Sequence, residues 1–362
     1  MKGFWFKSIL ILLEFILVSI NQTYGQKVLL SANGPGNTYE EINKKFAPGK
    51  DVIEVPDCVH SEFGRHINEI YDEELEKHVF NFFVHVVPDN DRCLNFDRQR
   101  TEIKTYGGSP DNLKAVLGET VIYSWKFKLP QNFKASKNFT HLHQIKSVGS
   151  IHSTSPMITL TARKSTPDRM ELRYTSTTMQ STLKTALLDL FRDEWVKVTE
   201  VIKYDNFGSY YIKISRISDG MVLLKYNISA IDTWQDGSKF SRPKWGIYRS
   251  IKDVSDLRDE QVRFDDFIIQ ELTPLSVLDY KSMSTKNKLK VNKSKMFVSI
   301  KNIPKNSYEE IELISENGKK IALNRLLQKN KIRLSGLPEG DYYISFLEAK
   351  QPVSIYTFTI EN

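Results

Sequence analysis

Short runs of apolar residues, many of them alternating with polar ones, follow one another from about Phe80 to Leu272. Turn-forming residues separate the runs, and little of this region repeats with the period of an amphipathic helix. Representative runs lie at 82–87, 121–127, 157–160, 171–174, 195–198 and 210–214. Only residues 39–46, 69–77 and 183–191 have the spacing of short helices. The pattern predicts an all-β fold, a concanavalin-like antiparallel sandwich of the β-jelly-roll type.

The composition changes near Pro274. Residues 281–295 are rich in Lys, Ser, Thr and Asn, which is typical of a solvated linker. Strand-like runs resume beyond this segment, with turn sequences between them. We therefore expect a β-jelly-roll domain at 26–272, a linker at 273–295 and a small C-terminal β-sandwich module at 296–362.

Residues 1–25 have the features of a secretory signal peptide. Lys2 and Lys7 precede an apolar run, and the small residue Gly25 follows it. The run is shorter than the about 20 residues that a membrane-spanning helix needs, and Glu14 interrupts it. We expect cleavage after Gly25 and a secreted or cell-surface protein without stable membrane insertion.

The two cysteines, Cys58 and Cys93, lie in the N-terminal part of this exported chain. Oxidising compartments favour a disulfide between them over two buried free thiols, and either arrangement would be structural. The formal net charge of +7 favours polyanionic partners only weakly, because much of the excess lies in residues 281–331. We expect no nucleic-acid partner.

Three strand-like segments carry polar side chains: 100–104 (Arg-Thr-Glu-Ile-Lys), 143–146 (His-Gln-Ile-Lys) and 244–248 (Lys-Trp-Gly-Ile-Tyr). Residues i and i+2 share one face of a strand. The first and third segments therefore each present a polar face, which suits a cleft, and a more apolar back, which suits a core.

The middle segment is ambiguous. Alternation places His141 and His143 on one face and Gln144 and Lys146 on the other. The pattern alone leaves open which pair faces the cleft.

The ordered motifs Arg-x-Glu-x-Lys, Gln-Ile-x and Lys-x-Gly-x-Tyr resemble those of the alginate-lyase family of jelly-roll polysaccharide lyases, and of the related ulvan and glucuronan lyases. The resemblance extends over roughly residues 89–272. It implies that Arg100, Gln144 and Tyr248 belong to an active site. Lys146 stands where the alginate lyases have His, so the resemblance supplies no histidine base at this position.

β-Elimination of a uronate explains these residue types. Removal of the C5 proton builds negative charge on the carboxylate, which Arg100, Gln144 and Lys146 would stabilise through hydrogen bonds. Tyr248 can act as both base and acid if cations such as Lys146, Lys244 or Arg249 favour its phenolate. A single tyrosine needs the proton and the leaving group on one side of the ring, which favours syn elimination on glucuronate or mannuronate.

We therefore expect a secreted, endo-acting polysaccharide lyase with an acidic polysaccharide as its partner and no required cofactor. The residues expected to bind substrate are His141, His143, Lys104, Lys244, Arg173 and Arg249. The alternative is a non-catalytic protein of the same fold that binds acidic glycans. A glycoside hydrolase is less favoured, because no closely spaced carboxylate strand is evident.

Structural interpretations remain open for several of these residues. Arg100 and Glu102 would also fit a cross-strand ion pair, and Glu102 fits an orienting role for Arg100 better than a catalytic one. His141 and His143 would fit hydrogen-bonded core positions or, in the cleft, an alternative base. Arg173 would fit a solvated surface.

Two further features concern accessory roles. Asp265 beside Asp266 would suit a structural Ca²⁺, although an edge or turn role needs no metal. Residues 336–344 resemble part of the C-terminal sorting modules of secreted bacterial proteins, which implies a contact with export machinery. The chain ends without the basic residue common in such modules, and a plain accessory β-sandwich fits as well.

Overall fold

The computed structural model describes residues 27–177, 179–272, 289–292, 297–299, 310–323, 327–328, 331–334, 336–348 and 351–360. The expected signal peptide and most of the expected linker lie outside the described residues.

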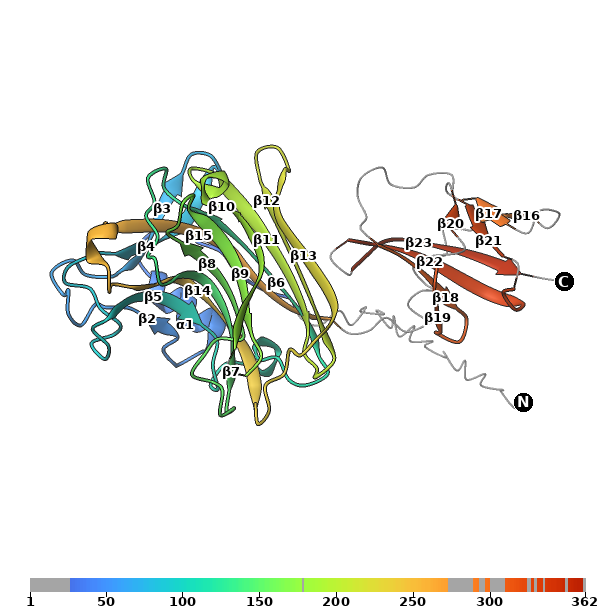
Figure 1. The fold of residues 1–362 in the computed structure, drawn as a ribbon, viewed down its shortest axis with the longest axis horizontal. Coiled ribbons are helices and arrows are strands. Elements are labelled where there is room, and N and C mark those ends of the chain that lie inside the picture. Colours follow the sequence, from blue (N-terminus) through green and yellow to red (C-terminus); the bar gives the residue numbers. More distant parts are fainter. Residues whose placement is uncertain are drawn as a thin grey trace, which may run out of the picture.

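Two antiparallel β-sheets make up most of residues 27–272 (Figure 1). Sheet I has eight strands, in the order β13 (Val222–Ile231), β12 (Gly208–Arg216), β11 (Trp195–Lys203), β6 (Thr120–Lys128), β15 (Glu260–Leu272), β4 (Lys77–Val84) and β3 (Ile67–Asp72), with β1 (Val28–Leu30) paired to β15. Sheet II has seven strands, in the order β10 (Gln180–Leu187), β9 (Arg169–Thr175), β8 (Ile158–Arg163), β7 (Thr140–Val148), β14 (Phe240–Ser250), β5 (Arg98–Lys104) and β2 (Ile53–Glu54).

The core lies between the two sheets. Trp125 of β6 and Trp245 of β14 are both fully buried, and their ring centroids lie 5.9 Å apart. Phe264 and Phe267 of β15 extend the same cluster. Strand alternation sends every second side chain into this layer, which explains why short alternating runs produce a sandwich. The predicted all-β jelly-roll class is confirmed.

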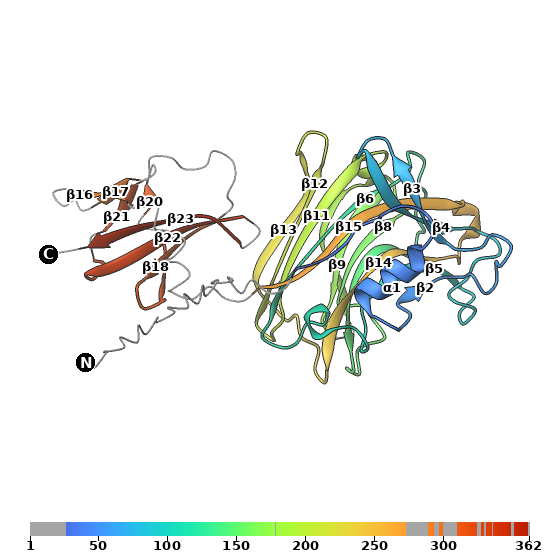
Figure 2. The same ribbon diagram turned by 180° about the vertical axis from the view of Figure 1, so that it is seen from behind.

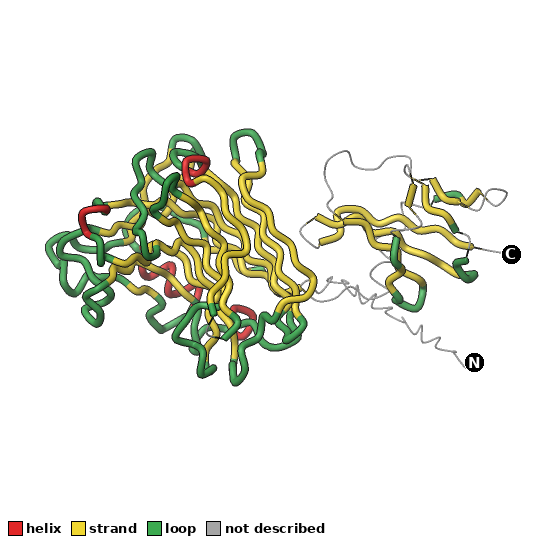
Figure 3. Tube along the Cα trace, in the orientation of Figure 1, coloured by secondary structure: helices red, strands yellow, loops and turns green. Residues whose placement is uncertain are grey.

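Helix is confined to a few short segments (Figure 3). The expected helix at 39–46 is present as α1 (Thr38–Phe46), which buries Ile42 and Phe46 and lies close to β2 and β5 (Figure 2). Its first turn is acidic and its last turn basic, as the helix dipole favours. The short 3₁₀ helices are η1 (Asp111–Leu113), η2 (Leu188–Phe191) and η3 (Val254–Asp256).

The other two helix predictions are wrong. Residues 69–77 form the end of β3, a turn and the start of β4, and the Asp72 carboxylate accepts hydrogen bonds from the turn amides of Glu74 and Leu75. Residues 183–191 continue β10 to Leu187 before a single 3₁₀ turn. Strand pairing outweighs local helix preference in both places.

The described part of the C-terminal region is also all β. One four-stranded sheet contains β16 (Val291–Asn292), β17 (Phe297–Ser299), β21 (Lys331–Arg333) and β20 (Leu327–Gln328). The other contains β19 (Lys320–Ile321), β18 (Glu310–Ser315), β22 (Gly340–Glu348) and β23 (Gln351–Ile360). Ile344, Phe346 and Phe358 contribute to a core of their own. The sorting function of this region stays a prediction.

Cys58 and Cys93 form the expected disulfide. Among the described residues, the structure has no helix of the length and apolar character needed to span a bilayer.

Candidate active site

The three motif segments lie on adjacent strands of sheet II. Strand β14 is flanked by β7 and β5, so Lys244 pairs with Gln144 on one side and with Lys104 on the other. Further along β14, Tyr248 pairs with His141 of β7 and Arg100 of β5. Residues far apart in the sequence thus form one continuous polar surface, here called the polar face: Arg98, Arg100, Glu102, His141, Gln144, Lys146, Arg242, Lys244 and Tyr248.

Strand alternation holds along β5 and β14. Trp245, Ile247 and Ile103 are fully buried on the core side, while Lys244 and Tyr248 lie on the polar face. Gly246 has φ +142°, and a Cβ atom there would lie 2.1 Å from the carbonyl oxygen of Thr101. Glycine therefore allows β14 to approach β5 at the centre of the site.

A register shift resolves the ambiguity of the middle segment. The β7–β8 ladder is irregular between His141 and His143, and the β14–β7 ladder is irregular between Trp245 and Tyr248. The irregularity breaks strict alternation, so His141 lies on the polar face together with Gln144 and Lys146. The expectation that both histidines share a face is wrong.

His143 and Arg249 lie on the core side. The ring nitrogens of His143 are 2.9 Å from Glu200 Oε2 and 3.0 Å from the Lys244 carbonyl oxygen. Arg249 Nε donates to Gln99 Oε1 at 2.8 Å. Both side chains are 0% exposed, so the prediction that they bind substrate is wrong.

Arg100 is surrounded by carboxylates. Its Nε lies 2.7 Å from Asp91 Oδ1, and its Nη1 lies 2.6 Å from Glu102 Oε2. Its guanidinium carbon lies 3.7 Å from the centre of the Tyr248 ring. These contacts make Arg100 a support beneath Tyr248, because its donors already have acceptors.

Glu54 of β2, which was not among the residues predicted from the sequence, joins this network. Its carboxylate pairs with Lys244 and, at 2.6 Å, with Lys104. Burial by itself would raise the pKa of Glu54, but Lys244, Arg100 and Lys104 hold this pKa well below its ordinary value. Lys104 and Lys244 are therefore neutralised within the site.

Gln144 is held by the same network. Its Nε2 donates a hydrogen bond to Glu102 Oε1, and the side chain is buried. Glu102 thus contacts Arg100, Gln144 and Lys244. These contacts fit the orienting role considered for Glu102.

Lys146 and Arg242 are cross-strand neighbours on the polar face. Within the described residues, neither has a carboxylate partner, and the Nε and Nη1 atoms of Arg242 are buried without a hydrogen-bond partner. Burial, with Lys244 and Arg100 nearby, lowers the pKa of Lys146 to about 8. Arg242 was not among the residues predicted from the sequence, although its position two residues before Lys244 places it on the same face.

Tyr248 lies partly exposed among these groups. Its hydroxyl accepts a hydrogen bond from Arg98 Nη1 at 2.9 Å. The His141 ring lies 5.9 Å from the Tyr248 ring, and Nδ1 of His141 has no hydrogen-bond partner among the described residues. Burial lowers the pKa of His141 to about 3, so this imidazole is neutral at pH 7.

The remaining predicted residues lie outside this group. Arg173 of β9 donates to Glu171 at 2.8 Å and to Gln180 at 2.9 Å, an arrangement that fits an ordinary paired surface residue. Asp265 pairs with Lys77 at 2.5 Å, and Asp266 pairs with Lys77 and Lys126. Lysines already neutralise both carboxylates, so the arrangement does not favour the expected Ca²⁺ site.

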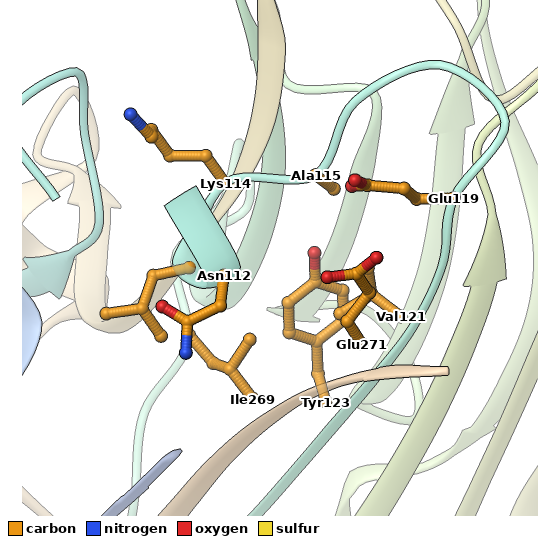
Figure 4. Close-up of a pocket in the computed structure, with 9 residues that line it drawn as sticks. Asn112, Lys114, Ala115, Glu119, Val121, Tyr123, Ile269 and Glu271 are labelled. Atoms are coloured by element: carbon orange, nitrogen blue, oxygen red, sulfur yellow. The ribbon is translucent and has the colours of Figure 1, made fainter. Parts of the chain in front are cut away.

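A small pocket elsewhere contains none of the predicted site residues (Figure 4). Its lining residues include Glu119, Tyr123 and Glu271, and burial together with Glu271 raises the pKa of Glu119. Two carboxylic side chains make this pocket unsuitable for an acidic polymer.

Comparison with known proteins also relates this chain to polysaccharide lyases. The family model described as Polysaccharide lyase matches residues 70–267, more than half of the chain and all three motif strands. Solved structures with similarity include an endo-β-1,4-glucuronan lyase from the fungus Trichoderma reesei (16% identity, TM-score 0.42, 56% of this chain and 86% of that chain). Another is a PL-14 alginate lyase from Aplysia kurodai (13% identity, TM-score 0.46, 70% of this chain and 100% of that chain). No curated protein matches the chain. The family match over the strands that build the polar face shows that this chain belongs to the polysaccharide lyase family.

Proposed function

We propose that this polysaccharide lyase cleaves a uronate-containing polysaccharide by β-elimination on the polar face of sheet II. β-Elimination requires an acidic proton at C5, and the uronate carboxylate attached to C5 supplies that acidity. The observation that carries the proposal is the position of Tyr248, a partly exposed phenol on the same face as the unneutralised cations Lys146 and Arg242.

Tyr248 is the proposed base and acid. Arg98 donates to its hydroxyl oxygen and Arg100 lies against its ring, so two cations lie beside this phenol. The phenolate would remove the C5 proton, the C4–C5 double bond would form as the bond to O4 breaks, and the phenol would return the proton to O4. One group acting at both positions implies syn elimination, which suits glucuronate or mannuronate.

His141 is the other candidate base. Its imidazole is neutral and close to Tyr248, but its pKa of about 3 makes it a weak proton acceptor. Tyr248 therefore fits the proton transfer better, with His141 helping to shape the space beside it.

The substrate carboxylate is proposed to bind Lys146 and Arg242. Arg100 and Gln144, which the sequence analysis also assigned to this role, already bind carboxylates of the protein. Arg242 has free donors on a planar guanidinium, and this geometry suits a carboxylate that gains negative charge in the transition state. Arg100 and Gln144 would then act as positioning residues.

The direct test is absorbance of the unsaturated uronate product during incubation with glucuronan, alginate, ulvan, heparin or chondroitin. We expect a rise with at least one polymer, and we expect Tyr248→Phe to reduce kcat by roughly 100-fold to 10,000-fold while retaining substrate affinity. Tyr71→Phe is the matched control, because Tyr71 is exposed on β3 of sheet I.

Two other results would contradict the proposed lyase mechanism. Binding to a polymer with no absorbance change for any of the polymers would favour the non-catalytic glycan-binding alternative. Full activity in Tyr248→Phe would remove Tyr248 from the mechanism. Export after cleavage near Gly25 is part of the same proposal, and N-terminal sequencing of the secreted protein tests it.

A further inference from the structure

A second cluster of titratable side chains includes two residues, His85 and Asp89, whose carbonyl oxygens accept hydrogen bonds from Gln99 of β5. His60, His66, His85 and Asp89 each offer one ligand atom, and these atoms all lie within 4.8 Å of one another. His60 and His66 come from the segment around the turn before β3, whereas His85 and Asp89 follow β4. The fold thus brings three imidazoles and one carboxylate together from two separate segments.

The distances suit a small divalent ion. Asp89 Oδ1 lies 2.9 Å from His60 Nδ1 and 3.1 Å from His66 Nε2, and Asp89 Oδ2 lies 3.1 Å from His85 Nδ1. In tetrahedral zinc sites, metal–ligand bonds of about 2.0–2.1 Å place neighbouring ligand atoms about 3.3 Å apart. Small side-chain movements would bring all four atoms to this spacing.

The contacts that His66 makes outside the cluster provide an independent indication of metal binding. Its Nδ1 lies 2.7 Å from Asp57 Oδ1, while its Nε2 points at the cluster. The Asp57 carboxylate is itself held by the Tyr39 hydroxyl at 2.8 Å. A metal-binding histidine commonly donates its other ring N–H to a carboxylate, which fixes the tautomer with the free lone pair toward the metal.

The surroundings make the cluster rigid and largely closed. The side chains of His66 and Asp89 are 0% exposed, and those of His60 and His85 are 14% and 16% exposed. The Cys58–Cys93 disulfide links the two segments that carry the cluster. Gln99 Nε2 donates to the carbonyl oxygens of His85, Val86 and Asp89.

We propose that His60, His66, His85 and Asp89 form a structural Zn²⁺ site. Three imidazole nitrogens and one carboxylate oxygen satisfy four-coordinate zinc, and Asp57 balances the remaining positive charge. The site holds the segment that carries Asp91, whose carboxylate binds Arg100 beneath Tyr248. The bound ion would therefore stabilise the segment that positions Arg100 against Tyr248.

The experiment uses the purified full chain after treatment with a chelator. Titration with Zn²⁺, followed by calorimetry and by elemental analysis after gel filtration, should give one ion per chain. Co²⁺ should bind at the same site and give the intense visible bands of tetrahedral coordination. At free Zn²⁺ about 100-fold above Kd, Tm should rise by roughly 5–10 °C.

Variants separate this site from nonspecific histidine binding. His85→Ala should abolish stoichiometric binding, and Asp57→Asn should weaken the affinity for Zn²⁺ about 10-fold to 100-fold while keeping every ligand. His78→Gln is the matched control, because His78 lies on β4 outside the cluster and packs against Tyr71. If His85→Ala fails to fold, the affinity of the soluble Asp57→Asn variant for Zn²⁺ decides whether the cluster is the binding site.

Two results would overturn the proposal. One is the absence of stoichiometric Zn²⁺ binding by the wild-type chain, which would make the cluster a hydrogen-bonded group with His66 between two carboxylates. The other is binding that Asp57→Asn and His85→Ala leave unchanged. Metal affinity is measured without substrate, so either result is independent of whether the chain degrades a uronate polymer.

Discussion

At the scale of single residues, His141 and His143 show how two nearby histidines acquire opposite environments. His141 lies on the polar face beside Tyr248, whereas His143 bonds to Glu200 in the core. The register shift between them, rather than their chemistry, separates their roles. Their substitution should therefore have different consequences.

His143→Gln should lower stability by about 1–3 kcal/mol, since a buried hydrogen-bonded pair loses its geometry. His141→Gln should leave stability nearly unchanged and reduce kcat by no more than about tenfold, because the proposed mechanism assigns the proton transfer to Tyr248. Urea unfolding and steady-state kinetics of both variants measure these effects. A loss of kcat in His141→Gln as large as in Tyr248→Phe would instead assign the base to His141.

The lowered pKa of Lys146 leads us to expect that substrate binding weakens at alkaline pH. Its pKa is lowered to about 8, so the ammonium is charged below pH 8 and loses its charge as the pH rises through this value. KM should therefore increase by about tenfold between pH 7 and pH 9 as a charge-assisted bond to the substrate is lost. Lys146→Arg should remove this increase, because arginine stays charged.

Lys104→Arg provides the comparison for this experiment. Lys104 lies on the same sheet, but its ammonium is paired with Glu54 at 2.6 Å. The KM profile of this variant should match that of the wild type. An alkaline increase in KM that persists in Lys146→Arg would contradict the assignment.

At the scale of elements, β14 is the strand on which the site depends. It contributes Arg242, Lys244 and Tyr248, and it pairs with both other motif strands. Its close approach to β5 requires Gly246, where a Cβ atom would overlap the backbone of Thr101. The same strand therefore determines the position of the chemistry and the packing of the sheet.

Gly246→Ala should destabilise the protein by about 3 kcal/mol or more, through backbone strain and the displacement of β5. Gly220→Ala is the matched control: Gly220 also has a positive φ, +73°, but a Cβ atom there meets nothing within 4 Å. Gly220→Ala should lower the free energy of unfolding by about 1 kcal/mol. Thermal unfolding of the two variants compares them, and equal losses would show that the contact with Thr101 is unimportant.

At the scale of the whole molecule, the described residues contain two separate main cores. One lies between sheets I and II and includes Trp125, Trp245 and Phe264. The other is built from β-strands after residue 289 and includes Ile344 and Phe358. Each set of strands buries its own apolar faces, as expected of independently folding units.

A chain limited to residues 27–272 should therefore fold and retain the lyase kcat of the longer chain on soluble oligosaccharides. All residues of the polar face and of the proposed zinc site lie within it. Circular dichroism and product absorbance of the shortened chain, measured beside the full chain, provide the test. Aggregation or loss of kcat would show that the C-terminal region completes the catalytic domain.

The sequence by itself determined the fold class, the motif strands and much of the site. Short alternating runs specify strands because alternation requires only neighbouring residues, and this pattern placed Arg100, Lys244 and Tyr248 on polar faces correctly. The sequence also indicated the disulfide, since only two cysteines are present in a chain expected to be exported. The helix predicted at 69–77 failed because a turn closed by Asp72 and pairing between β3 and β4 are stronger than local preference.

Only the tertiary structure decided which groups neutralise one another. Glu54 is far from Lys104 and Lys244 in the sequence but pairs with both, and this leaves Lys146 and Arg242 as the unneutralised cations. The register shift that separates His141 from His143, and the meeting of His60 and His66 with His85 and Asp89, also depend on contacts between segments far apart in the chain. Periodicity records which way a side chain points along one strand, whereas charge balance and metal coordination depend on distances between strands.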